Sequence, residues 1–430
     1  MELKEYQKSS LSQIKSYLEW LYRAKQEHNK RQALTSEFSD VETFDFTIAA
    51  WKKACNREYH PKKNGLSEHL PNFFIKIPTG GGKTLLACHT IDLINRVYLK
   101  KQTGIVLWVV PTTQIYRQTL VNLRNREHPY RQVLDLASAG RTVICEKGDK
   151  FTKTDIDENL VIMLLMLPSA NRKVKEVLRI FKDNGGFTEF FPPEDDIKGN
   201  QALLKEFPNL DCFGDETGFF GRIVKTSLGN TLKVLKPTVI IDEGHKTYSE
   251  SAQKTIRDFN PSIVVELSAT PPKNSNILVD ISGQALNQEE MIKLDMHIFN
   301  KSSYKWQDVL RDSLGKRLAL EKIAVEYESN TGRYIRPICL IQVERTGKEQ
   351  RGTKYIHAEE VREYLINQCG VTPEEVAVKS SETDDIEGID LLSRDCPIRY
   401  IITKQALQEG WDCPFAYILT VLTNPSSQLS

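Results

Sequence analysis

Three consecutive glycines followed by a lysine and a threonine form the most chemically informative segment of this 430-residue chain. Glycines let backbone N–H groups approach a phosphate closely, Lys83 adds positive charge, and the Thr84 hydroxyl is a ligand for Mg²⁺. A strict G-x-x-x-x-G-K-[ST] pattern would need glycine where the chain has Ile77, so the segment is a variant of that pattern. It predicts binding of a nucleoside triphosphate with Mg²⁺. The segment comprises Thr79, Gly80, Gly81, Gly82, Lys83 and Thr84.

Two adjacent carboxylates, Asp242 and Glu243, follow an apolar run, and His245 comes two residues later. In such a pair Asp242 would hold Mg²⁺, and Glu243 would orient and deprotonate an attacking water. His245 could pass a hydrogen bond to a second domain. Acidic turns after strands are common, so these residues alone leave a structural role open. The glycine loop upstream favours the interpretation that they hydrolyse a nucleotide.

Short apolar runs must position these two groups. They alternate with segments of helical spacing and are typical of a parallel sheet covered on both faces by helices. A second α/β alternation begins at residue 334. We therefore expect an α/β fold with two domains, 1–280 and 281–430, and inserts near 26–65 and 185–229. The runs of the first domain are 73–77, 104–110, 142–144, 160–167, 238–241 and 262–267, and those of the second are 334–341, 376–378 and 398–402.

Composition limits the partners and the compartment. The 58 basic and 57 acidic residues create no global field for a polyanion, although a local groove could still bind nucleic-acid phosphates. The eight cysteines form no C-x-x-C pair, which is typical of reduced thiols in a cytoplasmic protein. The longest apolar run, 160–167, is too short to cross a bilayer, and the N-terminus lacks a signal peptide. We expect a cytoplasmic protein with no membrane partner.

Two further segments have both a functional and a structural interpretation. Pro111, Thr112 and Thr113 follow the run at 104–110, where hydroxyls and helix amides could bind backbone phosphates. A threonine capping the next helix would explain the same residues. The phenylalanines scattered through 185–229 could stack on bases, or they could form a satellite cluster against the core.

Several motifs together resemble the superfamily two DExH helicases. They are the glycine loop, Asp-Glu-Gly-His at 242–245 and Ser-Ala-Thr at 268–270. In the second domain, Ala-Leu-Gln-Glu-Gly-Trp-Asp-Cys-Pro at 406–414 is most similar to the motor (Res) subunit of type III restriction enzymes and related DEAD/DEAH-box defence helicases. The resemblance extends from Tyr6 to Asp412.

The resemblance implies two RecA-like lobes that bind ATP and Mg²⁺. It implies catalytic roles for Lys83, Asp242, Glu243 and His245, and Mg²⁺ ligation by Thr84 and Asp242. The implied ATP contacts are Tyr6, Gln7, Thr79, Gly80, Gly81, Gly82, Lys83, Thr84, Gly410 and Asp412, and the implied nucleic-acid contacts are Pro111, Thr112, Thr113, Ser268 and Thr270.

As a function, the resemblance implies an ATP-dependent DNA translocase or helicase of a type III restriction or phage-defence system. Duplex DNA is the favoured partner, with single-stranded DNA or RNA as alternatives. A methylation and specificity subunit, or another defence subunit, is a further expected partner. An RNA helicase and a nucleotide-gated protein switch remain alternative interpretations.

One departure from the family pattern concerns arginines. The family closes its ATP site with a Gln-x-x-Gly-Arg-x-x-Arg segment shortly after the Gly-Trp-Asp motif, and this chain carries none before Ser430. We therefore expect a second lobe that is incomplete at its C-terminus, and no nuclease activity from this chain alone. Because an arginine finger contributes roughly 10³ to 10⁵ in rate, we expect ATP to be bound but hydrolysed barely or not at all, with or without DNA.

Overall fold

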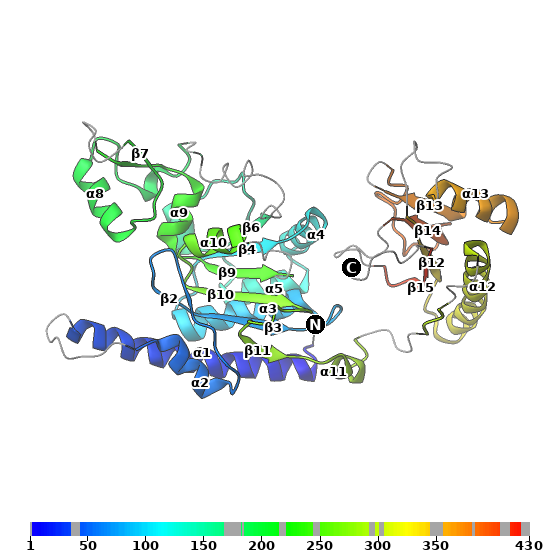
Figure 1. Ribbon diagram of the computed structural model, residues 1–430, viewed down its shortest axis with the longest axis horizontal. Helices are drawn as coiled ribbons and strands as arrows, with labels where there is room; N and C mark the ends of the chain where they lie inside the picture. The colour runs from blue at the N-terminus through cyan, green and yellow to red at the C-terminus, as the bar shows by residue number, and fades with distance from the viewer. Residues whose placement is uncertain are drawn as a thin grey trace. The chain divides into compact units, whose positions relative to one another are not determined.

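The chain divides into two compact units, Met1–Met296 and His297–Ser430, each built on a parallel sheet (Figure 1). The computed structural model describes residues 2–35, 44–166, 182, 185–214, 221–243, 250–291, 297–300, 305–344, 356–380, 383–404 and 413–422.

Among the described residues, the first unit has a seven-stranded sheet in which every neighbouring pair is parallel. This confirms the predicted α/β class. The strands lie in the order β11 (Ile277–Asp280), β3 (Asn72–Lys76), β10 (Ile263–Ser268), β9 (Thr238–Asp242), β4 (Gly104–Val110), β6 (Leu160–Met166) and β5 (Thr142–Cys145). β11 was not predicted from the sequence, because four residues give too short an apolar run to be recognised.

Apolar side chains from alternate positions of each strand enter two different cores. In β4, for example, Trp108 faces one core and Leu107 the other, as the two-residue period of a strand requires. Burial on both faces explains why these strands read as continuous apolar runs.

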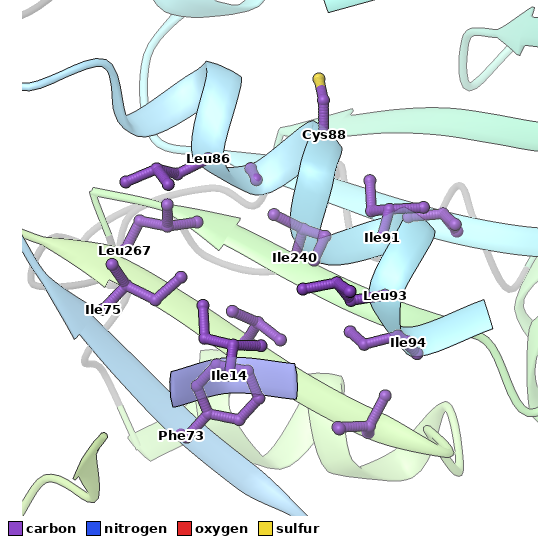
Figure 2. Packing of buried hydrophobic residues seen from close by; sticks show 14 of the residues in the cluster. Ile14, Phe73, Ile75, Leu86, Cys88, Ile91, Leu93, Ile94, Ile240 and Leu267 are labelled. Carbon is purple, nitrogen blue, oxygen red and sulfur yellow. The ribbon is translucent and has the colours of Figure 1, made fainter. Parts of the chain in front are cut away.

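The first core lies between the sheet and helices α1 (Glu5–Thr35), α2 (Phe46–Ala54) and α3 (Lys83–Leu93). Figure 2 shows Leu86 and Ile91 of α3 above strand residues that include Ile75 and Ile240. The segment 26–65, which we expected to be a polar insert, contributes Trp51 of α2 to this core, where it is 1% exposed. α3 continues as a π-helical turn (Ile94–Leu99), and α4 (Thr113–Arg124) and α5 (Pro129–Ala137) add further side chains.

The second core, on the opposite face, receives α6 (Lys153–Glu158), α9 (Leu228–Leu235) and α10 (Glu250–Asp258). Phe187, Phe191 and Phe207 from the 185–229 segment are buried in it, which favours the satellite-cluster interpretation over base stacking. The remaining described elements of this unit are β1 (Lys62–Lys63), β2 (His69–Leu70), the 3-10 turn Thr188–Phe190, α8 (Ile197–Glu206), β7 (Cys212–Phe213), β8 (Ile223–Val224) and α11 (Gly283–Gln288).

The described part of the second unit contains a four-stranded parallel sheet. Its order is β13 (Val376–Lys379), β14 (Tyr400–Thr403), β12 (Ile338–Gln342) and β15 (Ala416–Val421). Helices α12 (Trp306–Thr331) and α13 (Ala358–Cys369) pack on one face, and a 3-10 turn (Pro373–Glu375) leads into β13. Within the described ranges, no helix combines the length and the apolar character needed to cross a membrane.

Candidate nucleotide site

The candidate site lies where neighbouring strands of the first sheet reach their carboxyl ends. Strand register places Ser268 beside Lys76, and Leu267 beside Asp242, so β3, β10 and β9 end at nearly the same level. Open α/β sheets bind ligands at this edge. The order also separates the glycine-loop strand from the acidic strand by β10, so only tertiary structure brings the two motifs together.

The glycine loop needs glycine for two separate reasons. Gly82 has φ of +76° and ψ of +38° and forms the N-cap of α3, a left-handed conformation that other residues rarely adopt. Gly81 is confined by packing, since a Cβ there would lie 2.5 Å from Cγ1 of Ile77. Ile77 is fully buried, so the residue that departs from the strict pattern belongs to the core beneath the loop.

Lys83 and Glu243 form a direct ion pair across the site. The Lys83 Nζ and Glu243 Oε1 atoms are 2.5 Å apart, and their side chains are 11% and 9% exposed. Glu243 directly follows β9 with φ of +49°, an uncommon value for a residue with a Cβ. Such strained conformations cluster at functional sites. The acidic strand end and the glycine loop therefore meet through opposite charges.

Asp242 and Thr84 are the candidate Mg²⁺ ligands, and their surroundings suit that ion. Burial raises the pKa of the Cys88 thiol, and the negative charge of Asp242 raises it further, which places Asp242 close to α3. Thr84 precedes Cys88 by four residues and so lies on the same helix face. A carboxylate and a hydroxyl are oxygen donors that Mg²⁺ accepts when phosphates and waters complete its shell.

Tyr6 and Gln7, at the start of α1, lie against the glycine loop. The Tyr6 hydroxyl donates a hydrogen bond to the Gly81 carbonyl at 2.9 Å. Gln7 is 2% exposed, and its Oε1 accepts from the Lys4 N–H at 3.0 Å. Its Nε2 lies close enough to Gly82 that a Cβ there would be 2.8 Å away. Both side chains thus contact the loop, while adenine recognition by Gln7 stays a prediction.

Ser268 and Thr270 continue from β10 along the same edge. Ser268 is fully buried, its carbonyl accepts from the Ile77 N–H at 3.1 Å, and its Oγ accepts from the Thr270 N–H at 3.1 Å. Thr270 is exposed. Ser268 therefore joins the end of β10 to the start of the glycine loop, and a contact from either hydroxyl to nucleic acid remains a prediction.

Pro111, Thr112 and Thr113 follow β4, the strand next to β9. Thr112 is the N-cap of α4, and its side chain accepts from the Ile115 N–H at 3.3 Å. The structural interpretation of this residue is therefore correct, whereas a phosphate contact is not tested by the geometry. Thr113, the first residue of α4, is exposed. The predicted site residues His245, Gly410 and Asp412 lie outside the described residues.

Sequence reasoning missed the residues of α11 and its C-cap that approach the site. Leu286 is fully buried, and its Cδ2 would lie 3.1 Å from a Cβ on Gly81. The Glu289 carboxylate accepts from the Glu5 N–H at 3.3 Å. Six residues of helix contain no motif, so no sequence signal could have connected them with the glycine loop.

A cavity of about 600 Å³ elsewhere in the first unit is separate from this site. It is lined by residues that include His89, Lys100 and Leu136, near the loop that precedes β4. It therefore lies toward the amino ends of the strands, whereas the glycine loop and the acidic pair lie at the carboxyl ends.

A parallel sheet with a glycine-rich phosphate loop after one strand and an acidic pair after another defines a P-loop nucleotide-binding lobe of the RecA-like type. The sequence model of the family "Type III restriction enzyme, res subunit" matches residues 1–273, and the chain belongs to that family. This confirms the resemblance read from the motifs and identifies a motor of helicase superfamily two. No curated protein matches the sequence significantly.

Several solved structures are similar to the chain at low identity. S. cerevisiae Dbp5 bound to RNA and ADP BeF3 is 14% identical, with a TM-score of 0.32, over 87% of this chain and 76% of that one. The type ISP restriction-modification enzyme LlaGI with a DNA substrate mimic is 11% identical, with a TM-score of 0.29, over 77% of this chain and 24% of that one. The Sulfolobus solfataricus SWI2/SNF2 ATPase core with dsDNA is 10% identical, with a TM-score of 0.24, over 77% and 73%. The family assignment rests on the sequence match.

Proposed function

We propose that this chain is the motor of an ATP-dependent translocase or helicase that acts on duplex DNA in a restriction or phage-defence system. Membership of the Res-subunit family supports the motor class. The observation that carries the hydrolytic part is the 2.5 Å ion pair between Lys83 and Glu243. In this proposal Lys83 is the counter-charge for the phosphates and Glu243 is the general base, and the ion pair supports it because the two side chains are in contact.

The ion pair has a direct consequence for nucleotide binding. Phosphate oxygens and the Glu243 carboxylate would compete for the same Lys83 ammonium. Binding of ATP would therefore separate the pair and release Glu243, which could then accept a proton from the attacking water. When bound, Mg²⁺ would neutralise phosphate charge, and Asp242 with Thr84 would hold it. Before ATP binds, Glu243 is paired with Lys83, the residue that the phosphates must contact.

Two substitutions test this proposal by nucleotide binding to the 430-residue chain. Lys83→Ala should weaken the affinity for a fluorescent ATP analogue at least tenfold, because a charge-assisted contact contributes about 1.5–3 kcal/mol. Glu243→Gln should bind at least as tightly as wild type, because the competing charge is gone. It should also lower any turnover by about 10² to 10⁴, the usual contribution of a general base.

Glu206→Gln, on the exposed end of α8, is a matched control for the loss of one carboxylate. Thermal melting must accompany each measurement, because removing one member of a buried pair leaves the other charge unpaired. Wild-type turnover by Glu243→Gln would exclude Glu243 as the base, and unchanged nucleotide affinity in a folded Lys83→Ala variant would exclude the loop as the phosphate site.

A further inference from the structure

Two segments that are far apart in sequence meet at the glycine loop. The first is the start of α1, from which Tyr6 donates to the Gly81 carbonyl at 2.9 Å. The second is α11 with the residues that follow it. Leu286 packs against Gly81, and the Met291 carbonyl would lie 3.5 Å from a Cβ on Gly80. The loop is therefore held from two sides, by the start of α1 and by a segment around α11 that carries no recognised motif.

Glu289 joins these two segments to each other. Its Oε1 accepts from the Glu5 N–H at 3.3 Å, and its Oε2 lies 3.9 Å from the Lys4 Nζ. A carboxylate at this place is favoured by the positive end of the α1 dipole and by the free N–H groups of the first helical turn. Glu289, the residue after α11, thus binds the N–H of Glu5 in the first turn of α1. Tyr6 directly follows Glu5 in that turn.

The Tyr6 hydrogen bond controls the direction of one backbone N–H group. The peptide between Gly81 and Gly82 is planar and trans, so its C=O and N–H point in opposite directions. Because Tyr6 holds the carbonyl, the Gly82 N–H is turned away from Tyr6. Neither glycine has a Cβ to restrict this peptide, so without the hydroxyl the peptide could rotate more freely.

The Tyr6 hydroxyl is a donor at neutral pH, where an ordinary phenol is protonated. Burial raises the pKa of Tyr6, and the nearby Glu289 carboxylate raises it further, so this state extends to higher pH. The same proximity means that Glu289 acts on Tyr6 both through the α1 backbone and through its charge.

We propose that Tyr6 and Glu289 are positioning residues that hold the Gly81–Gly82 peptide in the orientation that receives the phosphates of a nucleotide. This inference rests on the proposed function and extends it to Glu289, which lies outside every motif. Neither side chain needs to touch the nucleotide. Their contribution is to keep the loop ordered before binding, so that less conformational entropy is lost when the phosphates arrive.

The test measures affinity for a fluorescent ATP analogue in the full 430-residue chain. Tyr6→Phe removes one hydroxyl and should weaken binding about tenfold, the upper range for a single hydrogen bond. Glu289→Ala should weaken it about threefold to tenfold, and Glu289→Gln, which keeps an acceptor for the Glu5 N–H, should lose less. Matched controls are Tyr22→Phe, elsewhere on α1, and Glu290→Gln, the exposed neighbour of Glu289; both should bind like wild type.

Two readouts separate positioning from a merely structural role. The variants should melt within a few degrees of wild type. In any residual ATP turnover, KM for ATP should rise while kcat at saturating ATP stays unchanged. The double variant Tyr6→Phe/Glu289→Ala should lose less than the product of the two single losses, because both act on one peptide.

The outcomes also separate this inference from the proposed function. Wild-type affinity in both Tyr6→Phe and Glu289→Ala, with affinity lost in Lys83→Ala, would overturn the positioning role and leave the proposed function standing. A fall in kcat without a rise in KM, or losses that simply follow the fraction of unfolded protein, would also overturn it. If the wild-type chain binds no nucleotide, or if Lys83→Ala binds it as tightly as wild type, the proposed function fails as well.

Discussion

At Gly82, both the backbone conformation and the packing of a neighbouring side chain restrict the position to glycine. Its φ of +76° disfavours any residue with a Cβ, and a Cβ would also lie 2.8 Å from the buried Gln7 Nε2. We expect Gly82→Ala to destabilise the first unit by about 1–3 kcal/mol, since the variant must adopt a strained conformation or displace the loop. Denaturant unfolding measures this change. Nucleotide affinity should fall at least tenfold, because Gly82 directly precedes Lys83.

Gly148→Ala is the matched control, because nothing lies within 4 Å of a Cβ at that position. It should change neither stability nor nucleotide affinity measurably. Wild-type nucleotide affinity in Gly82→Ala would show that the loop can rearrange without cost, and that the left-handed turn is not required for binding.

The start of α4 combines a structural residue with a candidate functional one. Thr112 caps the helix, whereas Thr113 is an exposed residue whose hydroxyl donates to the Met166 Sδ at 3.7 Å. We expect Thr112→Ala to lower stability by about 0.5–2 kcal/mol, the usual cost of losing an N-cap, and Thr112→Ser to restore most of it. We expect Thr113→Ala to leave stability unchanged and to weaken binding to a DNA duplex severalfold.

Thermal melting and fluorescence anisotropy with a labelled duplex distinguish these roles. Gln118→Ala, on an exposed position of the same helix, controls for general effects on α4. Full duplex binding by Thr113→Ala would remove this residue from the proposed nucleic-acid contacts.

For the whole molecule, near-neutral charge makes salt dependence informative. The formal net charge is +1, so a steep salt response would come from a local groove and not from a global field. For two to four phosphate contacts we expect duplex affinity to fall by about 10- to 100-fold between 50 and 200 mM salt, with little dependence on base sequence. Binding of unrelated duplexes at several salt concentrations provides the measurement.

Parallel titrations with single-stranded DNA and RNA separate the alternative partners. Tighter RNA than duplex binding would favour the RNA-helicase interpretation. A flat salt response, together with ATP turnover that no nucleic acid stimulates, would favour a nucleotide-gated protein switch.

Much of the fold and the polar groups of the site could be predicted from the sequence. Continuous apolar runs identified the parallel strands, because burial on both faces removes the polar alternation of a half-exposed strand. The glycine loop, Asp242 and Glu243 were recognisable because phosphate and metal chemistry restricts the residue types that can perform it. β15 was missed, since alternate positions such as Tyr417 and Leu419 are exposed and obscure its pattern.

Tertiary structure alone decided which residues meet. Lys83 and Glu243 lie 160 positions apart in the chain and form an ion pair because β10 inserts between their strands and aligns the carboxyl ends. Glu289 reaches α1 because β11 adds to the edge of the sheet beside β3 and directs α11 back over the glycine loop. The amino-acid sequence by itself determined most of the buried strands and the candidate reactive groups, since these depend on local periodicity and residue chemistry. Strand order and register determined the contacts, because they depend on packing between distant segments.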